Sequence, residues 1–317
     1  MKKAFKRVLK RIFIFILIAL VIYLVVSNLS MIRDLARKSK ISLIIDTDAA
    51  RGYDDLISIT RLVMNQEVEL SGLLSAQWRL YDLDNDSTVM LNHDLNYLIL
   101  KHFNLTQLPR YRGEELPLGF IGTEGKTMSP ASAIILKRAS EVPPGEKLDL
   151  VCLGPVTNLA KALEQDPSMS MKIRCYLMGP SYDPARRVWN KNEINTRLDL
   201  DAMDALLNNS DLEINLMPEN IAKELILNKK LVLEKFSQKD SLFRYIYSRI
   251  EEETLGMDYI NLESMALIQA ILSPEMSSQK QVITPSENTQ RKINLYTRID
   301  PVRMEKRIWK VMQEYAK

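Results

Sequence analysis

Cysteine and histidine are scarce in this chain of 317 residues. The two cysteines, Cys152 and Cys175, are too few for a disulfide scaffold, and neither stands where a lipoprotein carries its lipid. Each lies in an apolar run, so we expect both to be buried free thiols. The two histidines, His93 and His102, stand in no metal or catalytic motif, which favours packing or surface roles.

No stripe of basic and aromatic residues crosses the chain, and this absence excludes a nucleic-acid-binding surface. Internal repeats and low-complexity segments are missing as well. The formal net charge of +3 comes from the N-terminal head, where six basic residues precede residue 12. The remainder is close to neutral and long enough for one large α/β domain or two small ones.

An apolar run covers residues 12–26 and continues to residue 32, which is close to the length that spans a bilayer. A secretory signal is the competing interpretation, but its apolar region would be long and no small-x-small cleavage site follows. Because the stronger positive cluster precedes the run, we expect the N-terminus to stay in the cytoplasm. Residues 1–40 are therefore predicted to form a basic head, an uncleaved signal-anchor transmembrane helix and a stalk. They would hold a domain at 41–317 on the periplasmic or extracellular side of the inner membrane.

Short apolar strands alternate with helices after residue 41. Strands are predicted at 43–46, 69–76, 149–153, 173–178 and 212–217, and helices at 54–64, 88–102, 130–141, 158–165 and 201–208. Residues 225–255 are also predicted to be helical, and Asp300 followed by Pro301 begins a final helix. The alternation predicts an α/β fold with an open, mostly parallel sheet and helices on both faces. In such a sheet the site lies at the carboxyl ends of the strands.

Four aspartates lie within ten residues at the end of the first predicted strand: Asp46, Asp48, Asp54 and Asp55. Close carboxylates repel one another unless protons or a cation neutralise them. Asp46 and Asp48 are expected to point the same way because side chains alternate along a strand. Hard oxygen ligands of this kind suit calcium or magnesium. Helix capping is the alternative for Asp54 and Asp55, which begin the next predicted helix.

Three later segments carry polar residues in a recognisable order. They are Gly154-Pro155-Val156-Thr157-Asn158, Glu193-Ile194-Asn195 with Asp199, and the start of an apolar helix at Glu263. Together with the four aspartates they resemble the inosine–uridine preferring nucleoside hydrolase family in order and spacing, over nearly the whole chain after residue 41. The resemblance implies calcium-dependent hydrolysis of the N-glycosidic bond of a ribonucleoside or related N-riboside, as in purine and pyrimidine salvage.

The resemblance also implies roles for individual residues. Asp48 is expected to bind calcium and to take a proton from the attacking water. The implied calcium ligands are Asp48, Asp55, Glu263 and the carbonyl of Thr157, with Asp46 in support, and the implied ribose contacts are Asp54, Glu193 and Asn195. Family members often form dimers or tetramers, so the resemblance also allows a homo-oligomer.

The chain departs from the family pattern in the acidic loop and at the later helix. The loop between Asp48 and Asp54 is longer than in the commonest form, and Gly52 stands where the longer form usually has an acidic residue. Glu263 replaces the final calcium-binding aspartate. Leu262 replaces a histidine that often protonates the leaving base. Sugar and calcium binding are therefore expected to be better preserved than activation of the leaving group.

Other polar and aromatic residues are additional predicted substrate contacts. The segment Ser75-Ala76-Gln77-Trp78 stands where the family usually has a glycine and an asparagine, and its Gln77 and Trp78 are candidates together with Asn190. Trp78 or Trp189 is suited to stacking on a base, with core packing as an equal alternative.

Two functions of other classes remain open at this point. Leu262 and Gly52 favour a catalytically weakened riboside-binding protein on the same fold. Asp46-Thr47-Asp48 also resembles the strand-end motif of haloacid-dehalogenase-like phosphohydrolases, in which Asp46 would be the nucleophile. Against that interpretation, Ala50 stands where a threonine or valine is expected.

Overall fold

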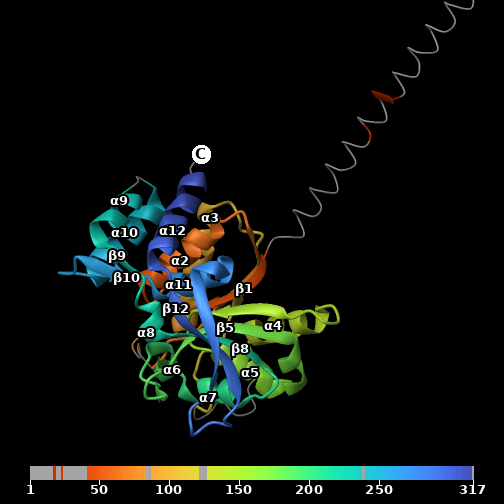
Figure 1. Ribbon diagram of the computed structural model, residues 1–317. Helices are drawn as coiled ribbons and strands as arrows, with labels where there is room; N and C mark the ends of the chain where they lie inside the picture. Colours follow the sequence, from red (N-terminus) through yellow and green to blue (C-terminus); the bar gives the residue numbers. More distant parts are fainter. Residues whose placement is uncertain are drawn as a thin grey trace, which may run out of the picture. The chain divides into compact units, whose positions relative to one another are not determined.

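An eight-stranded sheet forms the centre of the protein in the computed structural model, which describes residues 17–18, 23, 41–80, 82, 84, 87–120, 127–237 and 240–315. From one edge to the other the strands are β11 (Ser277–Ile283), β12 (Lys292–Ile299), β8 (Glu213–Pro218), β5 (Ile173–Gly179), β4 (Leu148–Cys152), β1 (Ile41–Thr47), β2 (Val68–Ser75) and β3 (Arg110–Arg112) (Figure 1). Contacts between Cα atoms divide the chain into two units, Met1–Ile41 and Ser42–Lys317. The second unit, together with the first residue of β1, contains the sheet and the helices that cover it.

The sheet is mostly parallel, as the sequence predicts. The pairs β12–β8, β8–β5, β5–β4, β4–β1 and β2–β3 are parallel, and the edge strand β11 runs antiparallel to β12. At the centre, Asp46 of β1 stands opposite Cys152 of β4. Two small antiparallel sheets lie outside the main sheet: β6 (Ser181–Asp183) pairs with β7 (Val188–Asn190), and β9 (Ile226–Asn228) pairs with β10 (Tyr259–Asn261).

Helices cover both faces of the sheet, which confirms the predicted layering (Figure 1). One side carries α2 (Tyr53–Val63), α3 (Thr88–His102), α11 (Glu263–Leu272) and α12 (Pro301–Tyr315). The other side carries α4 (Pro130–Glu141), α5 (Thr157–Gln165) and α7 (Leu200–Asn208). The remaining helices of the described residues are α6 (Ile194–Leu198), α8 (Glu219–Ala222), α9 (Lys229–Lys235) and α10 (Ser241–Glu253), with 3-10 turns at Pro167–Lys172 and Pro274–Met276.

The connections diverge where β1 and β4 lie side by side. After β1 the chain enters α2 on one face, whereas after β4 it enters α5 on the other face. This divergence leaves a crevice at the carboxyl ends of the two strands, which is where open α/β sheets bind their ligands. Asp48 follows β1 and Leu153 follows β4, so both residues lie at this crevice.

Each of the ten strands and helices predicted between residues 43 and 217 is present, and the predicted final helix is α12. The prediction that residues 225–255 are helical throughout is wrong. Residues 226–228 instead form β9, whose backbone pairs with β10, and the side chain of Asn228 then accepts a hydrogen bond from Leu231 N to start α9. The edge strand β11 was not predicted. Most of its residues are exposed and polar, so its sequence lacks the apolar alternation of a half-buried strand.

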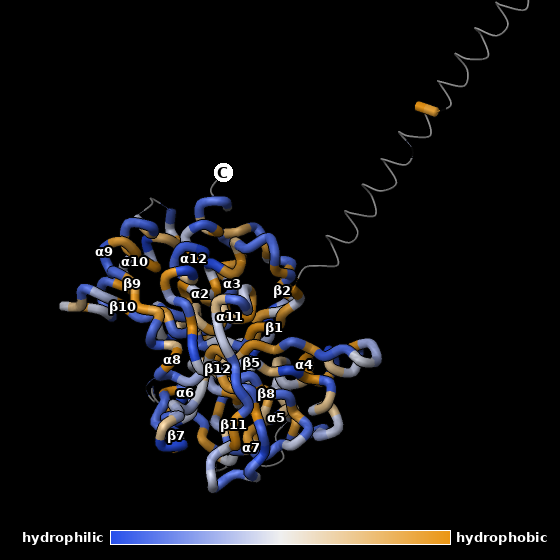
Figure 2. The backbone as a smooth tube through the Cα atoms, viewed as in Figure 1, coloured by the Kyte–Doolittle hydropathy of each residue, from blue (hydrophilic) through white to orange (hydrophobic). Residues whose placement is uncertain are grey.

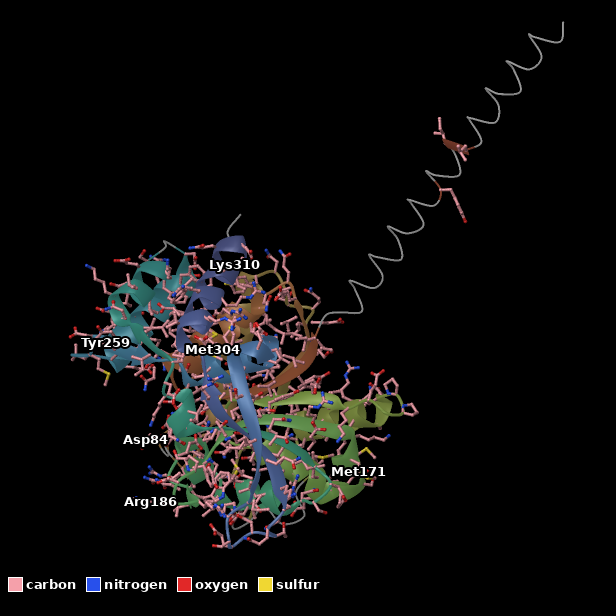
Figure 3. All side chains as sticks on the ribbon, in the orientation of Figure 1. Asp84, Met171, Arg186, Tyr259, Met304 and Lys310 are labelled. Carbon is pink, nitrogen blue, oxygen red and sulfur yellow. The ribbon has the colours of Figure 1, made fainter. Side chains whose placement is uncertain are left out.

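The core lies between the sheet and its helices. In Figure 2 apolar residues are concentrated along β1 and β2, whereas α12 shows polar residues on its outer side. Met304 and Ile308 of α12 are fully buried, and Lys310 is exposed (Figure 3). Cys152 and Cys175 are buried free thiols, as predicted.

The predicted signal-anchor segment at 12–32 falls outside the described residues, apart from residues 17, 18 and 23. Among the residues that are described, no helix combines the length and apolar character needed to cross a membrane.

Gly154 is required by the close approach of β4 to the acidic loop. A Cβ atom at this position would lie 3.0 Å from Cγ and Oδ1 of Asp48 and 3.1 Å from Cβ of Ala76. We expect Gly154→Ala to lower the free energy of unfolding by about 1–3 kcal/mol, because a packed site must shift to admit the methyl group. Gly72→Ala is the matched control, since its Cβ would meet its nearest atom at 3.7 Å. Urea unfolding of both variants tests this, and equal stabilities would contradict the proposed crowding.

Candidate active site

A pocket of about 630 Å³ lies at the carboxyl ends of β1 and β4. Its walls come from the loop after β1, the start of α2, the ends of β4 and β5, and parts of α6, α10 and α11. Six of the predicted site residues line it: Asp48, Asp54, Asp55, Glu193, Asn195 and Glu263. Segments that are up to 215 residues apart in sequence (Asp48 to Glu263) therefore meet at the edge that the sequence predicts.

Asp46 is fully buried and is not among the residues that line the pocket. Both of its carboxylate oxygens accept hydrogen bonds from Nδ2 of Asn158, at 2.9 and 3.0 Å. Burial raises the pKa of Asp46 to about 8, although the Asn158 hydrogen bond opposes this shift. Asp46 therefore supports the base of the site rather than facing a ligand.

Asp54 and Asp55 do not cap α2, because Gly52 is the N-cap residue and no side chain caps the helix. The carboxylate of Asp55 accepts hydrogen bonds from the hydroxyls of Thr47, at 2.6 Å, and Ser264. Oδ2 of Asp54 accepts a hydrogen bond from the backbone N of Ser264 at 2.8 Å. Burial raises the pKa of Asp54 to about 7 and that of Asp55 to about 8. The two aspartates thus join α2 to the start of α11.

Asp48 forms an ion pair with Arg51 inside the loop. Nε of Arg51 donates to Oδ2 of Asp48 at 2.6 Å, and the backbone N of Arg51 donates to the carbonyl of Asp48 at 2.7 Å. The Asp48 side chain is 1% exposed, so this contact is shielded from water. The carboxylate of Asp48 raises the pKa of Arg51 above its ordinary value, and the guanidinium stays charged.

The opposite wall carries Glu193, Asn195 and Glu263. Glu193 is the N-cap of α6, and its carboxylate accepts hydrogen bonds from the backbone N atoms of Asn195 and Thr196 and from the Thr196 hydroxyl. Nδ2 of Asn195 donates to the carbonyl of Leu153 at 2.6 Å. Burial raises the pKa of Glu263 to about 7, and Lys223 opposes this shift. Glu193 therefore has a structural role that fully engages its carboxylate.

Three acceptor oxygens at the pocket lack a donor among the described residues. They are Oδ1 of Asp48, Oδ1 of Asp54 and Oδ1 of Asn195, and each atom is buried. A buried acceptor without a partner costs about 1–3 kcal/mol, so these positions favour a ligand that brings hydrogen-bond donors. Sugar hydroxyls and water are donors of this kind.

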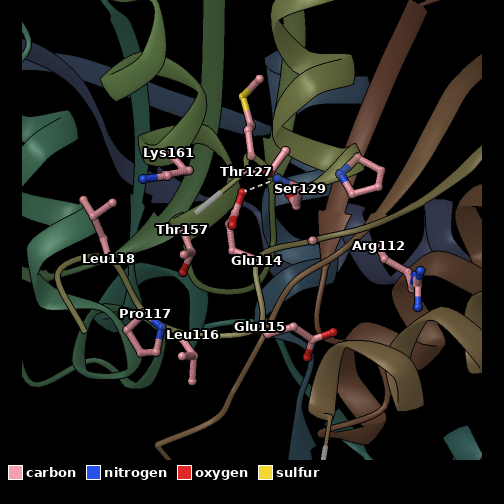
Figure 4. Close-up of a pocket in the computed structure, with 13 residues that line it drawn as sticks. Arg112, Glu114, Glu115, Leu116, Pro117, Leu118, Thr127, Ser129, Thr157 and Lys161 are labelled. Atoms are coloured by element: carbon pink, nitrogen blue, oxygen red, sulfur yellow. Dashed lines mark hydrogen bonds between the residues drawn. The ribbon is translucent and has the colours of Figure 1, made fainter. Parts of the chain in front are cut away.

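Thr157 and Gln77 lie away from the acidic pocket. The Thr157 hydroxyl donates to Oδ2 of Asp199 at 2.6 Å and accepts a hydrogen bond from Nε2 of Gln77 at 3.1 Å. Thr157 lines a separate pocket of about 380 Å³ together with Glu114 and Lys161 (Figure 4). Gln77 is fully buried, and its Oε1 also accepts a hydrogen bond from the backbone N of Arg79. Protein groups therefore occupy its side-chain amide.

Trp78 and Asn190 do not line the acidic pocket either. Trp78 is 4% exposed, which fits the alternative of core packing. Asn190 ends β7 on an exposed hairpin, where its Oδ1 accepts a hydrogen bond from Asn192 N at 3.0 Å. Trp189 packs on Tyr182 with 4.7 Å between ring centres. The geometry gives these residues no contact with the pocket.

Sequence reasoning missed several residues that shape the site. Arg51, Arg249 and Ser264 line the pocket, and Nη1 of Arg249 donates to the carbonyl of Ala50 at 3.2 Å. One signal was available for Arg51, because it is the single basic residue between Asp46 and Asp55. Arg249 and Ser264 carry no local signal, since only the fold brings α10 and α11 to the loop.

The family model described as inosine-uridine preferring nucleoside hydrolase matches residues 43–294. The chain belongs to this family. A rice protein (Oryza sativa subsp. japonica) named "Probable uridine nucleosidase 1" is 24% identical over 274 residues, which cover 77% of this chain and 81% of that protein. The rice "Probable uridine nucleosidase 2" is 25% identical over 172 residues, which span half of its length. Family membership confirms the predicted class of enzyme, a nucleosidase-type hydrolase.

Solved structures that share the fold include a nucleoside hydrolase and an effector protein. The plant nucleoside hydrolase PpNRh1 superposes with a TM-score of 0.66 at 18% identity, covering 86% of this chain and 98% of that one. The effector protein XOO4466 reaches a TM-score of 0.66 at 13% identity, covering 91% of this chain and 97% of that one. At these identities the likeness concerns the fold.

Nucleoside hydrolases of this family commonly use a metal ion, and two of the predicted calcium ligands of this chain, Asp48 and Asp55, have other partners in this structure. Calcium takes about six to eight oxygen ligands. Here Oδ2 of Asp48 is paired with Arg51, and both oxygens of Asp55 accept hydrogen bonds from hydroxyls. Within the described ranges, no group of three or more acidic, histidine or cysteine side chains is arranged to hold an ion.

The raised pKa of Asp46 predicts a pH dependence of stability. Its pKa is about 8 in the folded protein and near 3.8 without burial, so the folded state binds the proton more tightly. Stability from this group is therefore present at acidic pH and is lost as pH rises through about 8. In chelator-treated protein we expect Tm to fall as pH rises from about 5 to about 8, and to fall less in Asp46→Asn. The exposed Asp94→Asn is the control, and identical Tm profiles for all three proteins would contradict the assignment.

Proposed function

We propose that the acidic pocket binds the sugar of a ribonucleoside or related N-riboside and that Asp48 activates the water that cleaves the N-glycosidic bond. Family membership supports the reaction type. The observation that carries the proposal is the group of three buried acceptors without donors, from Asp48, Asp54 and Asn195, around one pocket. A ribose ring with its hydroxyls and one water molecule supplies the missing donors.

Two proton transfers accompany the cleavage: one from water to Asp48, and one to the departing nucleobase. Water attacks C1′ of the sugar while its proton passes to Oδ1 of Asp48, which accepts no hydrogen bond from the described residues. The bond from C1′ to the base nitrogen breaks, and its electron pair leaves with the base. Positive charge builds on the sugar during this step, and the carboxylate of Asp54 in the pocket wall is suited to stabilise it.

Glu263 is our proposed proton donor to the departing base. It lines the same pocket as Asp48 and directly follows Leu262, which stands where the resemblance expects a histidine. Burial raises the pKa of Glu263 to about 7, so its protonated form is well populated near neutral pH. Asp48 and Glu263 then resemble other catalytic carboxylate pairs, in which one member accepts a proton and the other donates one.

Replacing the proposed general base, Asp48, tests the proposal directly. Asp48→Asn is expected to lower kcat for ribose release by about 10²–10⁴-fold, because the amide cannot accept the proton of water. Asn195→Ala is expected to raise KM by roughly threefold to tenfold through a lost hydrogen bond to the sugar. Asn190→Ala, on the exposed hairpin, is the control and should match the wild type. Absence of ribose release by wild-type protein over a broad nucleoside panel would exclude the function.

The proton donor is tested by changing the leaving group. Glu263→Gln is expected to lower kcat/KM for inosine by about 10²-fold or more, because the base then leaves without a proton. For 7-methylguanosine, whose base is already cationic and leaves neutral, the same variant should be nearly unaffected. Wild-type kcat/KM for inosine should also fall as pH rises above about 7, the pKa of Glu263. Equal losses for the two substrates would contradict a role in proton donation.

Riboside binding without turnover is the second candidate function. Leu262 favours it, because this residue is fully buried and supplies no proton to a base. Calorimetric binding of a nucleoside or ribose with no release of base would select this alternative. Loss of that binding in Asp48→Ala would assign it to the same pocket.

The phosphohydrolase alternative loses support from the position of its nucleophile. Asp46 is fully buried, lies outside the pocket lining and has both oxygens engaged by Asn158. A nucleophilic carboxylate needs an oxygen that can reach the substrate.

We also propose that a signal-anchor segment at 12–32 holds this domain on the outer side of the inner membrane. The proposal rests on the apolar run and the six basic residues before it. Membrane fractionation with and without residues 1–40 distinguishes anchored from free protein.

A further inference from the structure

The loop after β1 places a positive charge inside the acidic pocket. Arg51 folds back on Asp48 through two contacts, from its backbone N to the Asp48 carbonyl and from Nε to Oδ2. The Arg51 side chain is 25% exposed, and it lines the pocket beside Asp54 and Asp55. Its position is therefore defined by the fold and does not depend on a chance surface contact.

Arg51 interacts with acidic groups from several elements. Its charge acts on Asp48 at the end of β1, on Asp55 in α2 and on Glu193 at the start of α6. It also acts on Asp54 and on Glu263 at the start of α11. One guanidinium thus faces the set of carboxylates that sequence comparison assigns to calcium and to the sugar. A cation at the centre of converging carboxylates is the electrostatic role of a metal ion.

Two of the predicted calcium ligands already have partners inside the protein. Oδ2 of Asp48 accepts from Arg51, and the two oxygens of Asp55 accept from Thr47 and Ser264. Oδ1 of Asp48 and Oδ1 of Asp54 are buried carboxylate oxygens at the pocket that accept no hydrogen bond from the described part of the chain. A divalent ion brought to them would also approach the guanidinium and be repelled by it.

We propose that Arg51 is the built-in cation of this site and that it takes the place of the divalent ion. It neutralises Asp48 while leaving Oδ1 of Asp48 free to receive a proton. The site then needs no calcium to hold its carboxylates together or to bind a sugar. The inference concerns ion binding at this pocket, so it is tested independently of whether hydrolysis occurs.

Calcium binding by wild type and Arg51→Ala tests the inference. Isothermal titration calorimetry with calcium chloride should give no one-to-one binding to chelator-treated wild-type protein. Arg51→Ala removes the guanidinium and frees Oδ2 of Asp48, so this variant should gain a calcium site. If Arg51→Ala is unstable without the ion, its Tm should rise with calcium concentration, whereas the wild-type Tm should not change. Adding Asp48→Asn to Arg51→Ala should abolish the gained site.

Arg249→Ala is the matched control. Arg249 also lines the pocket, but its guanidinium pairs with Glu253 at 2.5 Å and with the Tyr245 hydroxyl at 2.9 Å. This variant should not gain calcium binding. One-to-one calcium binding by wild type that Asp48→Asn removes would overturn the inference. Failure of Arg51→Ala to bind calcium, by calorimetry and by Tm, would also overturn it.

Discussion

The ion pair between Asp48 and Arg51 is the interaction on which the rest of the pocket depends. Several carboxylates converge at the end of β1, and burial makes their mutual repulsion costly. Three kinds of contact reduce this repulsion. The Arg51 guanidinium pairs with Asp48, hydroxyl groups donate to Asp55, and the Asn158 amide donates to Asp46. The acceptor oxygens that have no donor among the described residues, Oδ1 of Asp48, of Asp54 and of Asn195, lie at the pocket. The chemistry of the site therefore follows from how its negative charge is compensated.

The fold places these groups through one topological feature, the divergence of the chain after β1 and β4. Because α2 and α5 leave toward opposite faces, a crevice remains at the strand ends. Distant elements then close the crevice: α11 is held by the contacts of Ser264 with Asp54 and Asp55, and α10 is held by the contact of Arg249 with Ala50. The same contacts that assemble the pocket also stabilise the packing of α2, so a change at the site is expected to affect both.

The parallel sheet and the position of the site were predictable, because apolar periodicity and strand-end aspartates are local signals. Asp54 and Asp55 were ambiguous, since caps and ligands share the same pattern, and only the partner Ser264 in α11 distinguishes them. Gln77 was named at a place where this chain departs from the family pattern and Asn190 was a further candidate, and neither lines the pocket. The role of Arg51 was not predictable from charge alone, because an arginine in a loop usually faces solvent.

A crystal structure of the protein soaked in millimolar calcium and ribose tests the central claim most directly. It should show the sugar hydroxyls within hydrogen-bond distance of Oδ1 of Asp54 and Oδ1 of Asn195, with Arg51 still paired to Asp48. A calcium ion between Asp48 and Asp55 with Arg51 displaced would contradict the role of the guanidinium. An acidic pocket that binds no sugar under these conditions would contradict the proposed function as well.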